Sequence, residues 1–202
     1  MYNTPSELNA AFPPLVRRIE TEATIIGDQI LKIDHFLNHR IEPLFIAELG
    51  RELARRLSAY QPTLILTAEA SGIAPGLAVA QALNVPLVFA KKYAPQVESP
   101  ALSRIIPSPT KGGDTKLVLS QRYIPQGSRV VVIDDFLSNG RTAHALVEMA
   151  REAGAEVLGA GFIVEKRFKK GHELMEQLGV PVATLAQIEK LENGKAILAH
   201  NN

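Results

Sequence analysis

Two adjacent carboxylates and a loop of small polar residues form the segment most able to do chemistry. Residues 130–145 read VVVIDDFLSNGRTAHA. The apolar run predicts a buried strand that ends at Asp134 and Asp135, and residues 138–142 lead into a predicted helix. Because α/β proteins bind ligands at the carboxyl ends of parallel strands, this segment predicts a binding site.

The loop at residues 138–142 has the composition of a phosphate site. The N-terminus of a helix offers unpaired N–H groups and the positive end of its dipole to an anion. Gly140 allows a close approach of the backbone, and the hydroxyls of Ser138 and Thr142 can donate further hydrogen bonds.

The two carboxylates indicate that the ligand is more than a phosphate. Ionised Asp134 and Asp135 accept hydrogen bonds, and a sugar diol supplies two donors, so together with the loop they predict a ribose 5-phosphate group. A fixed carboxylate would also stabilise positive charge that develops on the sugar ring in a transition state. The alternative is that the acids only end a strand and the loop only turns the chain, and the combined pattern disfavours it.

Short apolar runs predict the strands that position this segment. Several are apolar at consecutive positions, which is typical of parallel strands covered on both faces. The runs lie at residues 63–67, 85–90, 116–120, 129–133, 157–164 and 182–185. Amphipathic patterns predict helices at residues 43–60 and 142–153. The alternation predicts a single α/β domain, with a mostly parallel central sheet flanked by helices.

Two segments depart from this alternation. Residues 91–113 contain four prolines and show neither period, so we expect a long flexible lid loop. The loop carries four cations: Lys91, Lys92, Arg104 and Lys111. They would either neutralise an anionic ligand when the lid closes or be ordinary loop charges. Residues 1–24 form a leader with no assigned role, in which we expect only a short helix.

The composition excludes several function classes. The chain has 202 residues, 46% of them hydrophobic, which suits one folded domain. Lys and Arg total 22 against 21 Asp and Glu, so no basic excess favours nucleic acid. The absence of cysteine excludes thiol nucleophiles and disulfides. Without a recognisable signal sequence or membrane span, we expect a cytoplasmic protein that binds neither nucleic acid nor membrane.

Residues 134–142 resemble the signature with which type I phosphoribosyltransferases bind phosphoribosyl pyrophosphate (PRPP). Asn139 stands where most members have threonine, and this Asn-Gly form resembles the bacterial xanthine phosphoribosyltransferases in particular. The similarity spans about residues 25–195. Four further segments follow in that family's order: DQILKIDHFLNH at 28–39, EASGIAP at 69–75, SPTK at 108–111 and IVEK at 163–166.

The resemblance implies roles for the residues that match the signature. Asp134 and Asp135 would be the catalytic acids, and would hold the ribose diol. The turn at Ala70, Ser71 and Gly72 would present backbone N–H groups to the pyrophosphate. The 5-phosphate of PRPP would be bound by Ser138, Asn139, Gly140, Arg141 and Thr142.

The base site follows from the same resemblance. Leu31 and Asn38 would line a purine from an N-terminal hood at residues 25–40, and Lys166 would donate to a purine carbonyl. A cation at that place favours an oxopurine over adenine, whose exocyclic amine is a donor.

The activity that the resemblance implies is purine salvage by transfer of the phosphoribosyl group from PRPP to xanthine. The products would be xanthosine 5′-monophosphate and pyrophosphate. Mg²⁺ would arrive with PRPP, without a direct metal site on the protein, and the enzyme would be a homodimer. Guanine, hypoxanthine or another purine remains an alternative base. A PRPP-sensing transcription regulator is the non-enzymatic alternative, and it would need a DNA-binding element that the leader is too short to form.

Overall fold

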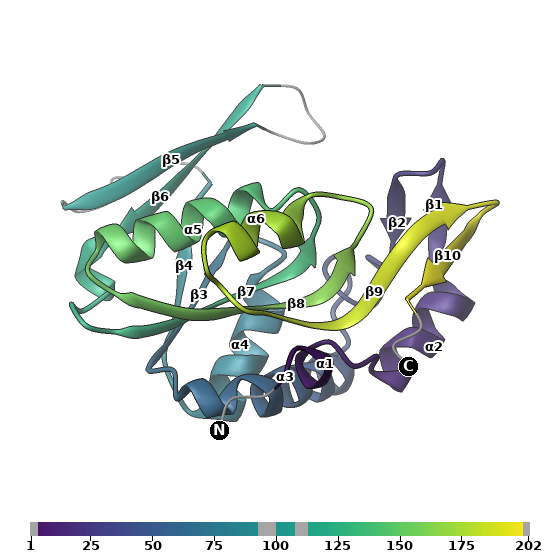
Figure 1. Ribbon diagram of the computed structural model, residues 1–202, viewed down its shortest axis with the longest axis horizontal. Helices are drawn as coiled ribbons and strands as arrows, with labels where there is room; N and C mark the ends of the chain where they lie inside the picture. The colour runs from purple at the N-terminus through teal and green to yellow at the C-terminus, as the bar shows by residue number, and fades with distance from the viewer. Residues whose placement is uncertain (1–3, 93–99, 108–112, 200–202) are drawn as a thin grey trace.

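The computed structural model describes residues 4–92, 100–107 and 113–199, and its centre is a six-stranded sheet (Figure 1). The strand order is β10-β9-β8-β7-β3-β4. All neighbours are parallel except β9 and β10. The strands are β3 (Leu64–Ala68), β4 (Leu87–Ala90), β7 (Arg129–Leu137), β8 (Glu156–Lys166), β9 (Val182–Glu192) and β10 (Lys195–Leu198). The predicted α/β class and mostly parallel sheet are confirmed.

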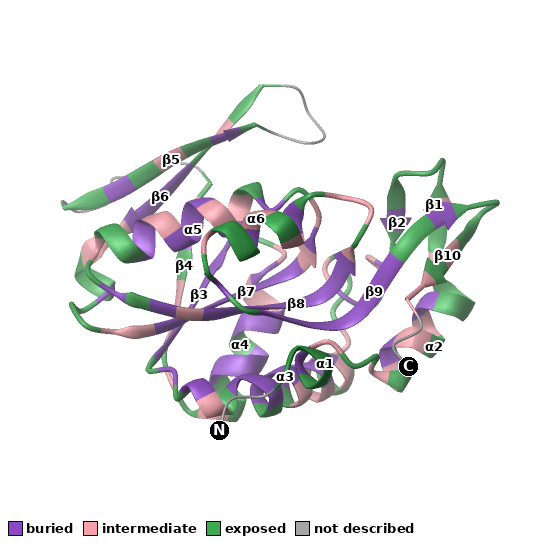
Figure 2. Ribbon diagram, in the orientation of Figure 1, coloured by how far each residue is buried: buried purple, intermediate pink, exposed green. Residues whose placement is uncertain are grey.

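Helices cover both faces of this sheet, so its strands are largely buried (Figures 1 and 2). One face carries α5 (Arg141–Glu152) and α6 (Gly171–Gln177), and the other carries α3 (Pro43–Leu57) and α4 (Ile73–Leu83). Alternate residues of β7 enter the two layers of the core. Val130 and Val132 pack in the cluster that contains α5, while Val131 and Ile133 pack with α3 and α4. A continuous apolar run therefore serves both faces.

The leader is part of the core. It forms α1 (Pro5–Leu8) and α2 (Pro13–Glu22), so the expectation of only a short helix was wrong for α2. Each helix begins with proline, whose missing N–H is harmless in a first turn. Leu8, Leu15 and Ile19 are buried in the core. The buried Arg56 guanidinium donates to the Leu8 carbonyl at 3.0 Å and to the Thr184 carbonyl at 2.6 Å, which ties the leader to β9.

The predicted hood begins with a small hairpin of β1 (Thr24–Ile26) and β2 (Ile30–Lys32). The rest of it, residues 33–40, consists of turns. Phe36 is fully buried beneath the Arg18 guanidinium, which lies 4.1 Å from the ring centroid. Arg18 also pairs with Glu42 at 2.6 Å, so the leader holds the hood in place.

The segment expected to be a loop contains a strand. β5 (Ala101–Pro107) pairs with β6 (Asp114–Ser120) in an antiparallel hairpin, so the run at residues 116–120 lies outside the central sheet. Leu102 and Ile106 are buried in the cluster that contains α5. The SPTK segment and Lys111 lie outside the described residues.

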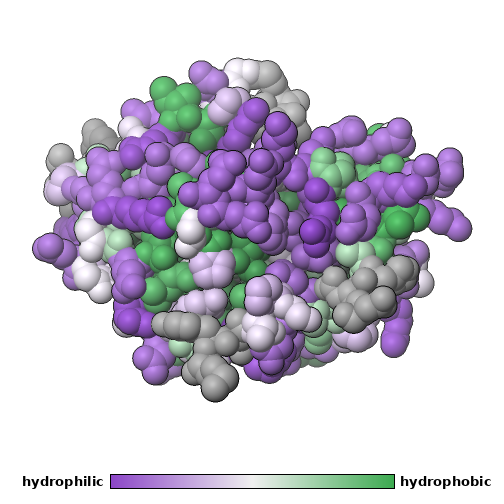
Figure 3. Space-filling model, viewed as in Figure 1, coloured by the Kyte–Doolittle hydropathy of each residue, from purple (hydrophilic) through white to green (hydrophobic). Residues whose placement is uncertain are grey.

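Two single-turn helices complete the elements, η1 (Ser58–Tyr60) after α3 and η2 (Gln121–Tyr123) after β6. In the described part of the chain, no helix is both long and apolar enough to cross a membrane. The face shown in Figure 3 is mainly hydrophilic, with hydrophobic residues near its centre.

Candidate active site

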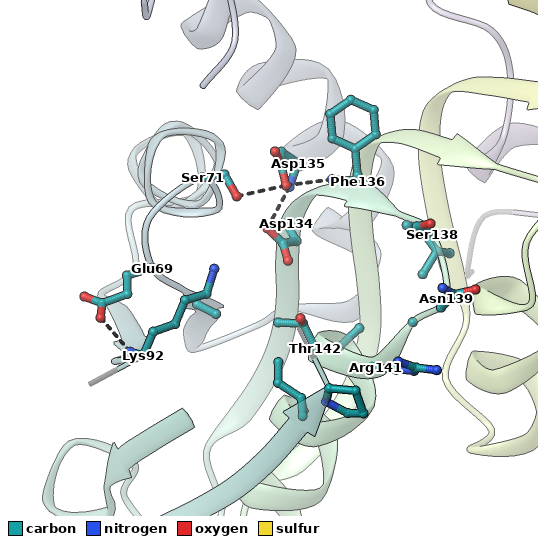
Figure 4. Close-up of a pocket in the computed structure, with 16 residues that line it drawn as sticks. Glu69, Ser71, Lys92, Asp134, Asp135, Phe136, Ser138, Asn139, Arg141 and Thr142 are labelled. Carbon is teal, nitrogen blue, oxygen red and sulfur yellow. Dashed lines mark hydrogen bonds between the residues drawn. The ribbon is translucent and has the colours of Figure 1, made fainter. Parts of the chain in front are cut away.

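A cleft opens where the sheet topology changes direction. β3 and β7 are neighbours, but the chain leaves β3 toward β4 at one edge and leaves β7 toward β8 on the other side. Loops that leave adjacent parallel strands in opposite directions separate and create a crevice at the carboxyl ends of those strands. The cleft is lined by Ala68, Glu69, Ser71, Lys92, Ile106, Pro107 and residues 134–143 (Figure 4).

The predicted phosphate loop lies in this cleft at the N-terminus of α5. Gly140 is the N-cap residue with φ +73°, and no side chain caps the first turn of the helix. The N–H groups of that turn are therefore available to an anion. The N–H of Gly171, in the first turn of α6, donates to the Ser138 carbonyl at 2.8 Å and holds the loop in place.

The turn after β3 faces this loop across the cleft, and it begins a second helix, α4, at Gly72. A Cβ atom on Gly72 would lie 2.0 Å from Thr67 Oγ1 and 2.7 Å from Asp134 Oδ1, so only glycine fits. The peptide bond between Glu69 and Ala70 is cis. Glu69 accepts a hydrogen bond from the Lys92 backbone N–H at 2.5 Å, which joins the turn to the end of β4.

The two acids lie between these loops, and both are nearly buried. Asp135 Oδ1 accepts from the Ser71 hydroxyl at 3.1 Å and from the Phe136 N–H at 2.9 Å. Its Oδ2 accepts from the Asn38 amide at 2.7 Å. Asp134 Oδ1 accepts from the Asp135 N–H at 2.9 Å. Asp135 is therefore held by three different segments of the chain.

Burial raises the pKa of the Asp134 carboxyl well above its ordinary value, and the neighbouring charge of Asp135 raises it further. The positive charge of Lys92 acts in the opposite direction. In Figure 4 the Lys92 side chain extends into the cleft toward Asp134. A cation, or the hydroxyl groups of a ligand, placed beside the two carboxylates would relieve their repulsion.

The three predicted base-site residues are not among those that line this cleft, although two of them contact residues that do. Asn38 contacts Asp135, and Lys166 ends β8 with its Nζ 5.6 Å from the centroid of the Phe136 ring. Leu31 is buried in the hood hairpin, only 6% exposed. Leu31 packs in the core, so only a small part of its side chain is accessible to a ligand.

The candidate lid cations have separate locations. Lys92 lines the cleft, whereas Lys91 forms an isolated antiparallel bridge with Val118. Arg104 pairs with Glu152 at 2.6 Å and with Glu148 at 3.3 Å, so β5 is attached to α5. These ion pairs support the alternative that Arg104 is an ordinary surface charge and does not bind the ligand.

A buried polar network behind the phosphate loop escaped the sequence analysis. Glu165, 1% exposed, accepts from His172 Nδ1 and from Gln187 Nε2, both at 2.9 Å. The hydrogen bond with Glu165 raises the pKa of His172. His172 follows Gly171 in α6, so the network anchors the helix that holds Ser138. Glu165 ends an apolar run and lies in the IVEK segment, but neither feature pointed to His172 or Gln187 as its partners.

The arrangement suits a ligand that carries anionic groups at two places and hydroxyls between them. Two helix N-termini converge on the carboxylate pair, and Lys92 adds a cation. Among the described residues, no group of three or more His, Cys, Asp or Glu side chains is arranged to hold a metal ion.

Comparison with known proteins agrees with this geometry. A model of the phosphoribosyl transferase domain family matches residues 38–191. A xanthine phosphoribosyltransferase of Chloroflexus aurantiacus is 54% identical over 93% of this chain and 89% of that protein. A protein with the same name from Heliobacterium modesticaldum is 42% identical over 90% of this chain and 97% of its own length.

Solved structures share the fold at lower identity. An adenine phosphoribosyltransferase from Giardia lamblia superposes with a TM-score of 0.73 at 18% identity, covering 89% of this chain and 98% of that one. The Saccharomyces cerevisiae adenine phosphoribosyltransferase gives a TM-score of 0.69 at 23% identity, covering 86% and 99%.

Proposed function

Because this chain belongs to the phosphoribosyl transferase domain family, we propose that it transfers the 5-phosphoribosyl group from PRPP to xanthine. The products are xanthosine 5′-monophosphate and pyrophosphate, and the role is purine salvage. The base assignment follows the names of the relatives at 54% and 42% identity.

The positions of two helix N-termini support this function independently of the relatives' names. Gly72 and Gly140 begin two helices on opposite sides of the same carboxylate pair, and neither helix has a side-chain cap. PRPP has two anionic ends separated by a ribose diol, so each end would meet the N–H groups of one helix. The 5-phosphate would lie at residues 138–142, and the pyrophosphate at the turn that contains Ser71 and Gly72.

The protein contributes mainly position and charge. Asp134 and Asp135 would accept hydrogen bonds from the ribose hydroxyls, and their charge would stabilise the cationic character that the sugar gains as pyrophosphate leaves. The purine nitrogen then attacks the anomeric carbon from the other face. A lid over the cleft would exclude water, which otherwise competes with the base. The described hairpin brings Ile106 and Pro107 to the rim of the cleft.

Mg²⁺ fits this site as a companion of PRPP. Magnesium favours oxygen ligands and keeps several waters, so carboxylate oxygens beside the diphosphate oxygens suit it without a dedicated protein cage. Bound there, it would neutralise charge on the departing pyrophosphate. The repulsion between Asp134 and Asp135 is the feature of this chain that such a cation relieves.

Lys166 is the residue that we assign to the base. An ammonium group donates and cannot accept, so it favours a purine carbonyl over the exocyclic amine of adenine. Leu31 and Asn38 would complete the pocket from the hood. Xanthine differs from guanine and hypoxanthine at the 2-position, and all three carry the 6-oxo group, so Lys166 separates them from adenine and not from one another.

We also propose that the enzyme acts in the cytoplasm as a homodimer. Apolar side chains are exposed around α3 and α4, with Leu44 87% and Leu77 55% exposed. Exposed apolar residues in one region are typical of a contact surface. Light scattering on the purified protein tests the dimer.

The activity is tested with purified protein, PRPP, Mg²⁺ and each of xanthine, guanine, hypoxanthine and adenine. Chromatography should detect xanthosine 5′-monophosphate as the fastest product. A faster rate with another purine would reassign the base. Tight PRPP binding without nucleotide formation from any of the four would favour the PRPP-sensing regulator.

A further inference from the structure

The turn of the hood hairpin contacts the lysine assigned to the base. Lys166 Nζ donates to the backbone carbonyl of Gln29 at 2.9 Å. Gln29 is the last residue of the three-residue turn that joins β1 to β2, where Ile26 pairs with Ile30. The contact therefore joins the hood to the end of β8, 137 residues further along the chain.

A second lysine holds the side chain of the same residue. The Lys169 ammonium donates to Oε1 of Gln29. Lys169 lies in the turn that follows β8, three residues after Lys166. Gln29 thus accepts from Lys166 through its backbone and from Lys169 through its side chain, and the two contacts define the position of the turn.

These contacts fix a group that would otherwise be mobile. Lysine carries its charge on a flexible stem, and ordering that stem opposes ligand binding. An ammonium has three N–H groups, so the Gln29 carbonyl uses one and leaves two for a ligand. The face of the Phe136 ring, 5.6 Å from Nζ, restricts the other side.

We propose that Gln29 and Lys169 are positioning residues of the base site, with Gln29 holding the Lys166 ammonium where it meets the purine and Lys169 holding Gln29. The inference rests on the proposed function, because it takes Lys166 as the residue that binds the base. Neither residue needs to touch the base itself.

The charges around Lys166 give a second way to observe Lys169. Burial lowers the pKa of the Lys166 ammonium, and the positive charge of Lys169 lowers it further, whereas Asp135 acts to raise it. Removal of the Lys169 charge should therefore move the titration of Lys166 to higher pH. Gln29→Leu removes only the Gln29 side-chain amide, so the positive charge of Lys169 remains.

The test compares Gln29→Leu and Lys169→Met with the conservative variants Gln29→Glu and Lys169→Arg. The first two should each raise the KM for xanthine about tenfold, the effect of losing one hydrogen bond to a charged group. The KM for PRPP should stay within about twofold, because the sugar-phosphate contacts are untouched. The double variant should be no worse than the single variants, and the conservative variants should retain most of the affinity.

Lys170→Met is the matched control, because Lys170 is an exposed neighbour of Lys169. It should leave both KM values unchanged. An unchanged KM for xanthine in Gln29→Leu and Lys169→Met would overturn the inference. Equal rises of both KM values, with a lower melting temperature, would also overturn it, since they would indicate general destabilisation.

NMR titration of the Lys166 side chain separates this inference from the proposed function. If the wild-type protein transfers phosphoribosyl to no purine, the proposed function fails, and the titration needs no turnover. Lys169→Met should raise the pH at which Lys166 titrates, and Lys169→Arg should not. A Lys166 signal that neither Lys169→Met nor Gln29→Leu alters would overturn the inference by itself.

Discussion

The Asn38 amide donates a 2.7 Å hydrogen bond to Oδ2 of Asp135, and this contact joins the hood to the carboxyl end of β7. The residue assigned to the base and the residue assigned to the ribose therefore share one hydrogen bond. Ser71, from the turn assigned to the pyrophosphate, donates to the other oxygen of Asp135 at 3.1 Å. Asp135 is the point at which the three parts of the proposed site meet.

Asp135→Asn should reduce kcat by about a hundredfold, since it removes the fixed negative charge beside the cationic sugar while keeping the shape of the side chain. Steady-state kinetics with saturating PRPP and xanthine measures the change. The melting temperature should shift little, because the asparagine oxygen can still accept from Ser71 and Phe136, and Asn38 can turn its amide so that its oxygen accepts from the new NH2 group. A variant with almost unchanged kcat would show that the carboxylate has no catalytic role.

Asp134→Asn should lower activity but stabilise the protein at neutral pH. The folded-state pKa of Asp134 is raised by burial and by Asp135, so the ionised carboxyl opposes folding. The favourable contribution of Asp134 is present below its ordinary pKa and is lost as the pH rises through the raised value. We expect a melting temperature a few degrees higher at pH 7, since about 1 kcal/mol corresponds to roughly 2–4 °C in a chain of this size.

Thermal melts of wild type and Asp134→Asn between pH 4 and pH 8 check the sign. The advantage of the variant should shrink toward pH 4, where the wild-type carboxyl is protonated. A variant that is less stable than wild type at neutral pH contradicts the buried repulsion.

Gly140→Ala should raise the KM for PRPP by at least about tenfold, because the phosphate must approach the backbone at this position. Gly127→Ala is a matched control. Gly140 has φ +73° and Gly127 has φ +77°, so alanine strains both. A Cβ on Gly127 meets nothing within 4 Å, whereas one on Gly140 lies 3.0 Å from Gly171 Cα.

Both variants should lose stability, and only Gly140→Ala should lose PRPP affinity. Equal PRPP affinity in the two would argue against the loop as the phosphate site.

His172→Ala should destabilise the protein more at pH 6 than at pH 9. The hydrogen bond with Glu165 raises the pKa of His172 above its ordinary value. The stabilisation is complete below that ordinary value and is lost as the pH rises through the raised one. We expect a loss on the order of 1 kcal/mol at pH 6, measured by urea unfolding. His39→Ala is the control, because His39 is exposed, and it should leave the free energy of unfolding nearly unchanged. A loss of stability in His172→Ala that does not depend on pH would contradict the charged pair of His172 and Glu165.

The sequence was sufficient for the parts of the site that are continuous along the chain. Strand β7, its two acids and the loop at residues 138–142 follow one another without a gap, so local patterns predicted their order and their shared edge of the sheet. The parallel sheet was also predictable from local patterns, because continuous apolar runs indicate strands that are buried on both faces.

Contacts between distant segments were beyond local patterns. The bond from Asn38 to Asp135 spans 97 residues, and the bond from Lys166 to the Gln29 carbonyl involves a backbone atom that every residue possesses. Strand β5 was missed because its alternation is short and is flanked by prolines. It gains stability from β6 and from the ion pairs of Arg104 with α5, which only the tertiary structure provides.

The most direct measurement is a crystal structure of the protein grown with PRPP and Mg²⁺. We expect the 5-phosphate within hydrogen-bonding distance of the N–H groups of residues 138–142, and the ribose hydroxyls at Asp134 and Asp135. PRPP bound elsewhere, with this cleft empty, would contradict it.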